Sequence, residues 1–234
     1  MGVQSVQPSP GSHLIELTLD AFRIAHRAAV AAAEGVATSS KTLLEEVREH
    51  ERELDSLDRD IDDLVTTTII KVGDEEARTL LACMKFGISL ERIGDLLLSF
   101  VNRAESVASH VDHDDIRDLT VMSSQLEKML VDVEVAFRTR SLDKAVNVLR
   151  ADTEIDRLRN VITFRHLEPA EGLRRLESFH VLFMAQELER AGDHVKNMAE
   201  EVCHLVSGRT VRHVLRAYDH PVEQLFLEHM KHKQ

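Results

Sequence analysis

Apolar side chains recur along this chain at alternating steps of three and four residues, which is the spacing of one face of an α-helix. From about Lys41 to Val72, this face carries Leu43, Val47, His50, Leu54, Leu57, Ile61 and Leu64. Stripes of the same kind cover the segments of about 14–37, 74–106, 116–137, 142–166 and 173–206. Because each stripe is long and one-sided, the pattern predicts six helices that pack against one another in bundles.

Short polar segments interrupt these stripes. Gly73-Asp74 is typical of a helix stop followed by a helix start, and the segment 168–172 contains the Pro and Gly of a turn. The acidic run from His110 to Asp115 breaks the period and predicts the connection between two halves. The predicted fold is all-α, with two tandem three-helix bundles over 13–109 and 110–208, a mobile tail over 1–12 and a C-terminal tail over 209–234.

A short motif occurs twice, once in the last predicted helix of each half. The first copy is Leu90-Glu-Arg-Ile-Gly-Asp95 and the second, 98 positions later, is Leu188-Glu-Arg-Ala-Gly-Asp193. A glycine inside a helix costs about 1 kcal/mol relative to alanine, so its presence in both copies indicates a shared requirement for close packing or for a site. The Glu and Asp of each copy are four residues apart and lie on one helix face.

The middle predicted helix of each half carries an acidic pair of its own, in the pattern Asp-x-x-Ile-Asp-x-Leu. Each acid of these four pairs follows a residue of the apolar stripe by one position, which is a rotation of about 100°. In two antiparallel neighbouring helices, this rotation turns both sets of acids to the same side. We therefore expect a groove lined by four carboxylates in each half: Asp58, Asp62, Glu91 and Asp95 in the first, and Asp152, Asp156, Glu189 and Asp193 in the second.

The heights of the two acidic pairs along the helix axes are a separate question. In the second half, the sequence midpoint between the two pairs falls at about residue 172, inside the predicted turn, so the pairs should be level. In the first half the midpoint falls at about residue 76, three residues beyond Gly73. At a rise of 1.5 Å per residue, the first site is then expected to be staggered by about 9 Å.

Composition and charge narrow the possible partners. The chain is 43% hydrophobic but only 4% aromatic, as is common in helical bundles, and its net charge of −12 argues against binding to a nucleic-acid backbone. Cys83 and Cys203 form no paired motif, which predicts free thiols in a reducing cytoplasm. No apolar run approaches 18 residues, so no membrane span is expected.

Four converging carboxylates repel one another unless a cation compensates their charge. Oxygen ligands suit hard ions, namely magnesium, calcium, manganese or oxidised iron, better than structural zinc. The alternative is a metal-free helical bundle, in which these acids are solvated or paired with neighbours such as Arg92 and Arg190. Both interpretations are compatible with the spacing.

The sequence does not favour an enzyme. A di-iron carboxylate enzyme of the ferritin type needs Glu-x-x-His on two different helices. The two matches, which begin at Glu177 and Glu201, fall on the same predicted helix about 36 Å apart. No nucleophile–base arrangement and no glycine-rich phosphate loop stands out either.

The duplicated Glu-Arg-x-Gly-Asp motif and the acidic pairs of the middle helices resemble the PhoU family, over about Leu14 to His213. That resemblance implies a non-enzymatic cytoplasmic regulator, acting as a homodimer, that couples a phosphate ABC transporter ATPase to a sensor histidine kinase. It further implies dampened phosphate uptake and phosphate-starvation gene expression. It also implies multinuclear metal sites on the eight acids named above.

The two halves match the family pattern unequally. After Gly192-Asp193 the chain reads His194-Val195-Lys196-Asn197, close to the family pattern, whereas the first copy is followed by Leu96-Leu97-Leu98-Ser99. A vacant or altered site is therefore expected at the first copy.

Overall fold

The computed structural model describes residues 10–107, 111–167 and 173–207, and within these ranges all regular structure is helical. The helices are α1 (Pro10–Thr38), α2 (Lys41–Thr68), a 3-10 turn (Ile69–Lys71), α3 (Asp74–Val107), α4 (His113–Thr139), α5 (Leu142–Arg165) and α6 (Leu173–Ser207). The all-α prediction is confirmed. The expectations for residues 1–9, for the turn at 168–172 and for the tail over 209–234 lie outside the described residues.

Two helices begin earlier than the sequence pattern predicts. Helix α1 starts at Pro10 rather than Leu14, since proline fits the first turn of a helix, where its missing N–H is not needed. Helix α4 starts at His113 rather than Ile116. Asp115 was expected in the connection between the halves, but it lies within α4 and is buried. That part of the prediction is wrong, because Arg165 of α5 donates a hydrogen bond to the Asp115 carboxylate.

The first two helices of each half are joined in the same way. Ser39 and Arg140 adopt left-handed backbone angles, with φ of 54° and 53°, and end α1 and α4. The next residues, Ser40 and Ser141, cap α2 and α5, because each hydroxyl accepts a hydrogen bond from the backbone amide three residues later. Equivalent turns in both halves agree with a tandem repeat.

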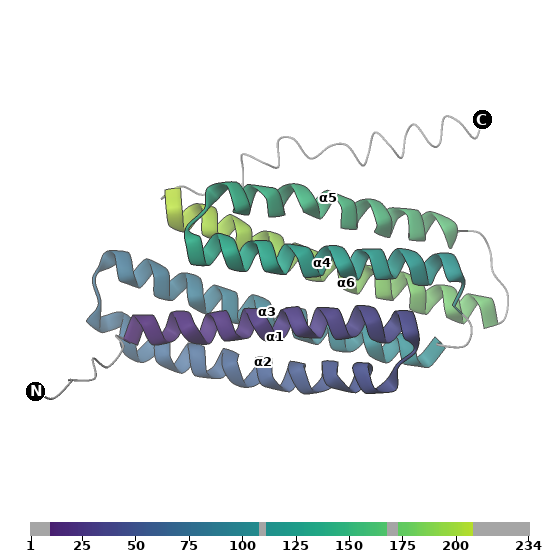
Figure 1. The fold of residues 1–234 in the computed structure, drawn as a ribbon, viewed down its shortest axis with the longest axis horizontal. Coiled ribbons are helices and arrows are strands. Elements are labelled where there is room, and N and C mark those ends of the chain that lie inside the picture. The colour runs from purple at the N-terminus through teal and green to yellow at the C-terminus, as the bar shows by residue number, and fades with distance from the viewer. Residues whose placement is uncertain (1–9, 108–110, 168–172, 208–234) are drawn as a thin grey trace, which may run out of the picture.

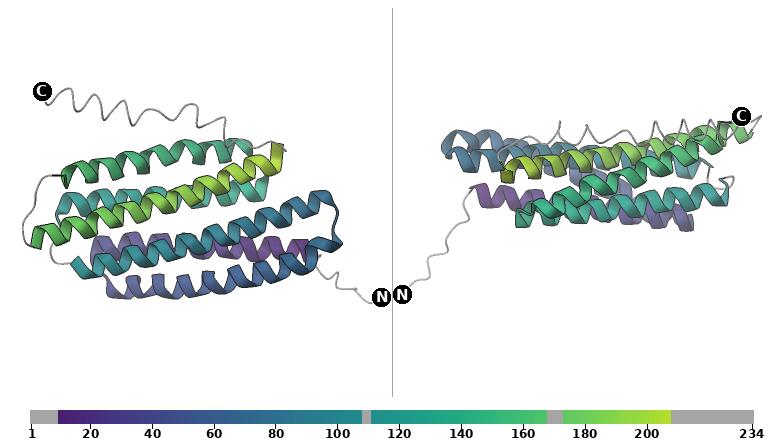
Figure 2. Two further views of the ribbon diagram at one scale, coloured as in Figure 1. Left: turned by 180° about the vertical axis from the view of Figure 1, so that it is seen from behind. Right: turned by 90° about the horizontal axis from the view of Figure 1, so that it is seen from above.

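The two bundles pack side by side rather than end to end. Helices α1 to α3 occupy one half of the molecule and α4 to α6 the other (Figure 1). Helix α1 packs against α4, and α3 packs against α6, so the first and third helices of the two bundles form the contact between them. Seen from behind, α3 and α6 run next to each other across one face (Figure 2). Within the described residues, no helix is long and apolar enough to cross a membrane.

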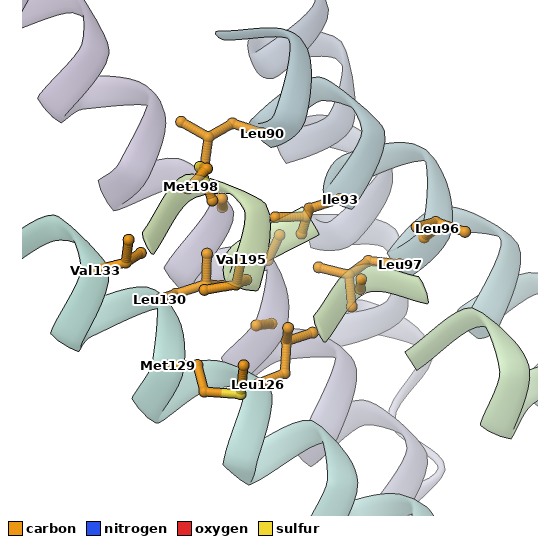
Figure 3. Close-up of a cluster of buried hydrophobic side chains, with 14 of the residues drawn as sticks. Leu90, Ile93, Leu96, Leu97, Leu126, Met129, Leu130, Val133, Val195 and Met198 are labelled. Carbon is orange, nitrogen blue, oxygen red and sulfur yellow. The ribbon is translucent and has the colours of Figure 1, made fainter. Parts of the chain in front are cut away.

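One hydrophobic core runs through both bundles. The rings of Phe22, Phe86 and Phe137, from α1, α3 and α4, lie with centroids 4.9 to 6.4 Å apart. A second cluster joins α3, α4 and α6, and includes Leu97 and Val195 (Figure 3). Burial of these side chains fixes the position of α3 relative to α6, and with it the relative position of the two repeated motifs.

Candidate functional site

The two motif glycines pack tightly against the preceding helix of their own half. A Cβ atom added to Gly94 of α3 would lie 2.8 Å from Leu54 Cδ1 and 3.7 Å from Glu51 Cα of α2. A Cβ atom added to Gly192 of α6 would lie 3.1 Å from Ile155 Cδ1 and 3.4 Å from Asp152 Oδ1 of α5. Each glycine therefore packs against an acid and the aliphatic residue three positions after it.

These contacts establish which acids of α2 and α5 are equivalent. Glu51 and Leu54 occupy the places in the first half that Asp152 and Ile155 occupy in the second. The sequence pattern had matched Asp58 to Asp152 instead. That match is displaced by seven residues, or about 10 Å along α2.

The first carboxylate cluster consists of Glu51, Asp55, Asp58, Glu91 and Asp95. Burial raises the pKa of Glu91, and the negative charges of Asp95, Asp58 and Asp55 raise it further, against the effect of Arg92. The pKa of Glu51 is raised by burial and then by Asp55 and Asp95. Acids of α2 and α3 thus act on one another electrostatically across the helix pair.

The predicted site residues of α2 are only partly in this cluster. Burial raises the pKa of Asp58, with a further contribution from Asp62 on the same helix. Asp62 is exposed, and its negative charge acts on Asp58. The structure thus brings together Asp58, Glu91 and Asp95 as expected, leaves Asp62 at the margin, and adds two acids that the sequence reasoning missed.

The second carboxylate cluster contains all four acids predicted for it. Burial raises the pKa of Glu189, and Asp193, Asp156 and Asp152 add to the increase, while Arg159 opposes it. The side chain of Asp152 is only 3% exposed. Burial raises the pKa of Asp152 even though Lys196 donates a hydrogen bond to its carboxylate. The level arrangement predicted for this half agrees with the packing of Gly192.

Basic side chains neutralise part of the charge in both clusters. In the first, Arg92 lies 3.3 Å from Glu91 Oε2 and 3.2 Å from Asp95 Oδ2. In the second, Lys196 Nζ lies 2.7 Å from Asp152 Oδ2.

Glu189 of the second cluster has two polar neighbours. Arg159 Nη2 lies 3.5 Å from Glu189 Oε1, and the Gln186 amide donates to Glu189 Oε2 at 2.6 Å. Protein groups therefore engage at least two acids in each cluster, namely Glu91 and Asp95 in the first and Asp152 and Glu189 in the second.

The donor atoms of both clusters are carboxylate oxygens, which fit hard cations by type. Their arrangement does not show a preformed site: among the residues that the structure describes, no three His, Cys, Asp or Glu side chains are gathered so that they could hold a metal ion. A metal would require these carboxylates to turn from their basic partners toward a common point.

A further group of buried charges lies at one end of the second bundle. Asp115 and Asp118 of α4 are buried, and the guanidinium of Arg165 donates hydrogen bonds to both. The ring of His166 lies 3.0 Å from Asp115 Oδ2 and 2.9 Å from Ser178 Oγ of α6. These partners, about 50 positions away in the sequence, explain why an acidic run that looked like a solvated connection is instead folded into a helix.

Comparison with protein families places both repeats in one family. The PhoU domain model matches twice, over residues 18–104 and 119–202. The phosphate-specific transport system accessory protein PhoU homolog of Pseudomonas aeruginosa is 30% identical over 183 residues, which cover 74% of this chain and 73% of that protein. A homologue from Thermotoga maritima is 26% identical over 195 residues, covering 80% and 83%.

Solved structures have the same fold. The crystal structure of PhoU from Pseudomonas aeruginosa aligns with a TM-score of 0.78 at 22% identity, covering 86% of this chain and 99% of that chain. PhoU from Streptococcus pneumoniae gives the same TM-score at 19% identity and covers 86% and 97%. Because the domain model matches both halves and the alignments cover most of the length of the relatives, the chain belongs to the PhoU family.

Proposed function

We propose that this chain is a non-enzymatic regulator of phosphate transport. The main support is the double match to the PhoU domain, which covers both bundles. The relatives of the chain are named accessory proteins of the phosphate-specific transport system.

The finer proposal concerns partners. The chain acts in the cytoplasm, as a homodimer, and couples the ATPase of a phosphate ABC transporter to a sensor histidine kinase. In this way it dampens both phosphate uptake and phosphate-starvation gene expression. The net charge of −12 favours basic protein surfaces as partners over nucleic acid.

Affinity capture of the full chain from phosphate-replete cells tests the partners. Recovery of the transporter ATPase or of the sensor kinase, lost when the bait is absent, supports the proposal. Measurement of phosphate uptake in cells that lack the chain tests the direction of regulation. Uptake should increase in rich medium, and unchanged uptake together with no captured component of phosphate transport would reject the regulatory role.

The carboxylate clusters are proposed to bind divalent or trivalent metal ions. The support is the donor set, the repetition in both halves, and the mutual increase in carboxylate pKa, which a cation would relieve. In the second cluster, Asp152, Asp156, Glu189 and Asp193 would hold the ion. In the first, Glu51, Asp55, Glu91 and Asp95 occupy the equivalent places, and Asp58 lies beside them.

Elemental analysis after chelation and reloading tests the metal proposal. The double variant Glu189→Gln/Asp193→Asn should lose the metal of the second cluster and keep its helical circular dichroism. The variant Asp60→Asn/Asp63→Asn is a matched control, because it removes two exposed carboxylates of α2 outside both clusters. Equal metal content in the two variants would refute the assignment.

The second candidate is a metal-free bundle that acts through protein contacts alone. It is favoured by one observation, the engagement of Glu91, Asp95 and Asp152 by Arg92 and Lys196. This candidate predicts that the reloaded protein binds no stoichiometric metal at all.

A further inference from the structure

The two carboxylate clusters differ in the basic side chains that pair with their acids. Lys196 of α6 lies one turn beyond Gly192, and its ammonium group contacts the most buried carboxylate of the second cluster, that of Asp152, at 2.7 Å. The Asp152 side chain is 3% exposed and the Lys196 side chain is 26% exposed. The ammonium group of Lys196 thus neutralises the charge of the most buried carboxylate in this cluster.

The first cluster has no lysine at the matching place. Position 98, which precedes Lys196 by the 98-residue repeat, is a leucine. Arg92, which is 57% exposed, pairs with Glu91 and Asp95 at the rim. The exposed Arg52 and Arg59 of α2 act electrostatically on Glu51 and Asp58, so the basic groups of this cluster are surface arginines. A surface ion pair of this kind contributes little, whereas a buried one is costly to separate.

We infer that Lys196 is an internal counter-ion that competes with metal ions for the second carboxylate cluster, so that the second cluster binds them more weakly than the first. This order is the reverse of the one expected from the motif sequences. The inference rests on the proposed binding of metal by these carboxylates. A metal ion that enters the second cluster must first separate Lys196 from Asp152.

The lysine side chain is suited to this role. Its ammonium group is a compact charge on a flexible stem of four carbons, and it exchanges one partner for another without a fixed geometry. Because Lys196 is partly exposed, its head group can turn to solvent while its stem stays packed. The second cluster therefore has two compensated states, one with lysine and one with metal.

Titration of the full chain with Mn²⁺, followed by the electron paramagnetic resonance signal of free Mn²⁺, tests the inference. The wild type should show two classes of sites, the weaker of which is lost in Glu189→Gln/Asp193→Asn. In Lys196→Met, the weaker class should bind about tenfold more tightly, equivalent to about 1.4 kcal/mol. The control Lys85→Met removes an exposed lysine that pairs with Glu201, and should change neither class by more than about twofold.

A second pair of measurements keeps the test valid if the lysine variant is unstable. Lys196→Met leaves Asp152 buried without its partner, so the melting temperature of this variant should be lower than that of the wild type. Added Mn²⁺ should raise the melting temperature of the variant by more than it raises that of the wild type. The variant Lys196→Met/Asp152→Asn removes both charges and should regain the melting temperature lost in Lys196→Met, if that loss comes from the unpaired carboxylate of Asp152.

The outcomes separate the inference from the proposed function. If the wild type binds Mn²⁺ at the second cluster and Lys196→Met binds it no more tightly, the inference is overturned and the metal proposal stands. If the affinity lost in Glu189→Gln/Asp193→Asn is the stronger class, the inferred order of the clusters is wrong. If no form of the chain binds Mn²⁺, the metal proposal fails and the inference fails with it.

Discussion

Gly94 lies so close to Leu54 that a Cβ atom at position 94 would be 2.8 Å from Leu54 Cδ1. Leu54 is buried in the core and has little room to move, so Gly94→Ala should destabilise the protein. Overpacking costs about 1 to 3 kcal/mol, and the better helix propensity of alanine returns about 1 kcal/mol. The net loss should be as much as about 2 kcal/mol in urea unfolding. Gly192→Ala, where the closest approach is 3.1 Å, should lose less.

The register of the first cluster can be tested by comparing two double variants. Glu51→Gln/Asp55→Asn should weaken Mn²⁺ binding at the first cluster more than Asp58→Asn/Asp62→Asn, because Gly94 packs beside Glu51 and not beside Asp62. Both variants remove two negative charges from α2, so each is the charge-matched control of the other. A greater loss in the Asp58/Asp62 variant would restore the register expected from the sequence pattern.

The buried charges of α4 predict a dependence of stability on pH. Burial alone would raise the pKa of Asp118, but hydrogen bonds from Arg165 and Arg117 hold it below its usual value. A carboxyl with a lowered folded-state pKa stabilises the protein above its unfolded value of about 3.8, and this contribution is lost as pH falls through the folded value. Asp118→Asn should therefore cost about 2 kcal/mol at pH 7 and flatten the loss of stability in acid.

Chemical unfolding monitored between pH 7 and pH 3 measures this effect. Asp114→Asn is the control, because the Asp114 side chain is 62% exposed and pairs with the exposed Arg117. That variant should stay within about 0.5 kcal/mol of the wild type. Parallel pH profiles for Asp118→Asn and the wild type would contradict the stabilising role of the buried pair.

The two cysteines should be inert in the folded protein. Burial raises the pKa of the Cys83 thiol to about 11, despite a hydrogen bond involving Thr18, and also raises that of Cys203. The thiolate is the reactive form, so a disulfide reagent should modify neither residue at pH 7 until the chain unfolds. Labelling that proceeds at the same rate in native and unfolded protein would show that the core around Cys83 opens readily.

The helices were largely predictable because long one-sided apolar stripes determine them. The helix ends were harder to predict where they depend on a contact with a residue far away in the sequence. Asp115 lies in a locally polar run, and only Arg165 and His166, far away in the sequence, make its burial favourable. Local pattern carries no information about such pairs.

The acids of the second cluster were all predicted, whereas those of the first were predicted only in part, for a reason of periodicity. The apolar stripe of α2 repeats every seven residues, so Asp58 and Glu51 lie on almost the same face, and the sequence pattern alone does not choose between them. The sequence midpoint between the acidic pair of α2 and that of α3 does distinguish them, because it should fall in the turn between the two helices. The stagger of about 9 Å expected for Asp58 and Asp62 was itself the signal that acids nearer the start of α2 belong to the cluster, as Glu51 does beside Asp95.

The proposed function requires the carboxylate clusters as the functional site of a phosphate regulator. Its most direct test is the expression of a phosphate-starvation gene in phosphate-rich medium, in cells that lack the chain and are supplied with a variant. The wild type and Asp60→Asn/Asp63→Asn should restore repression, whereas a folded variant with Glu91, Asp95, Glu189 and Asp193 neutralised should not. Full repression by that neutralised variant would contradict the account.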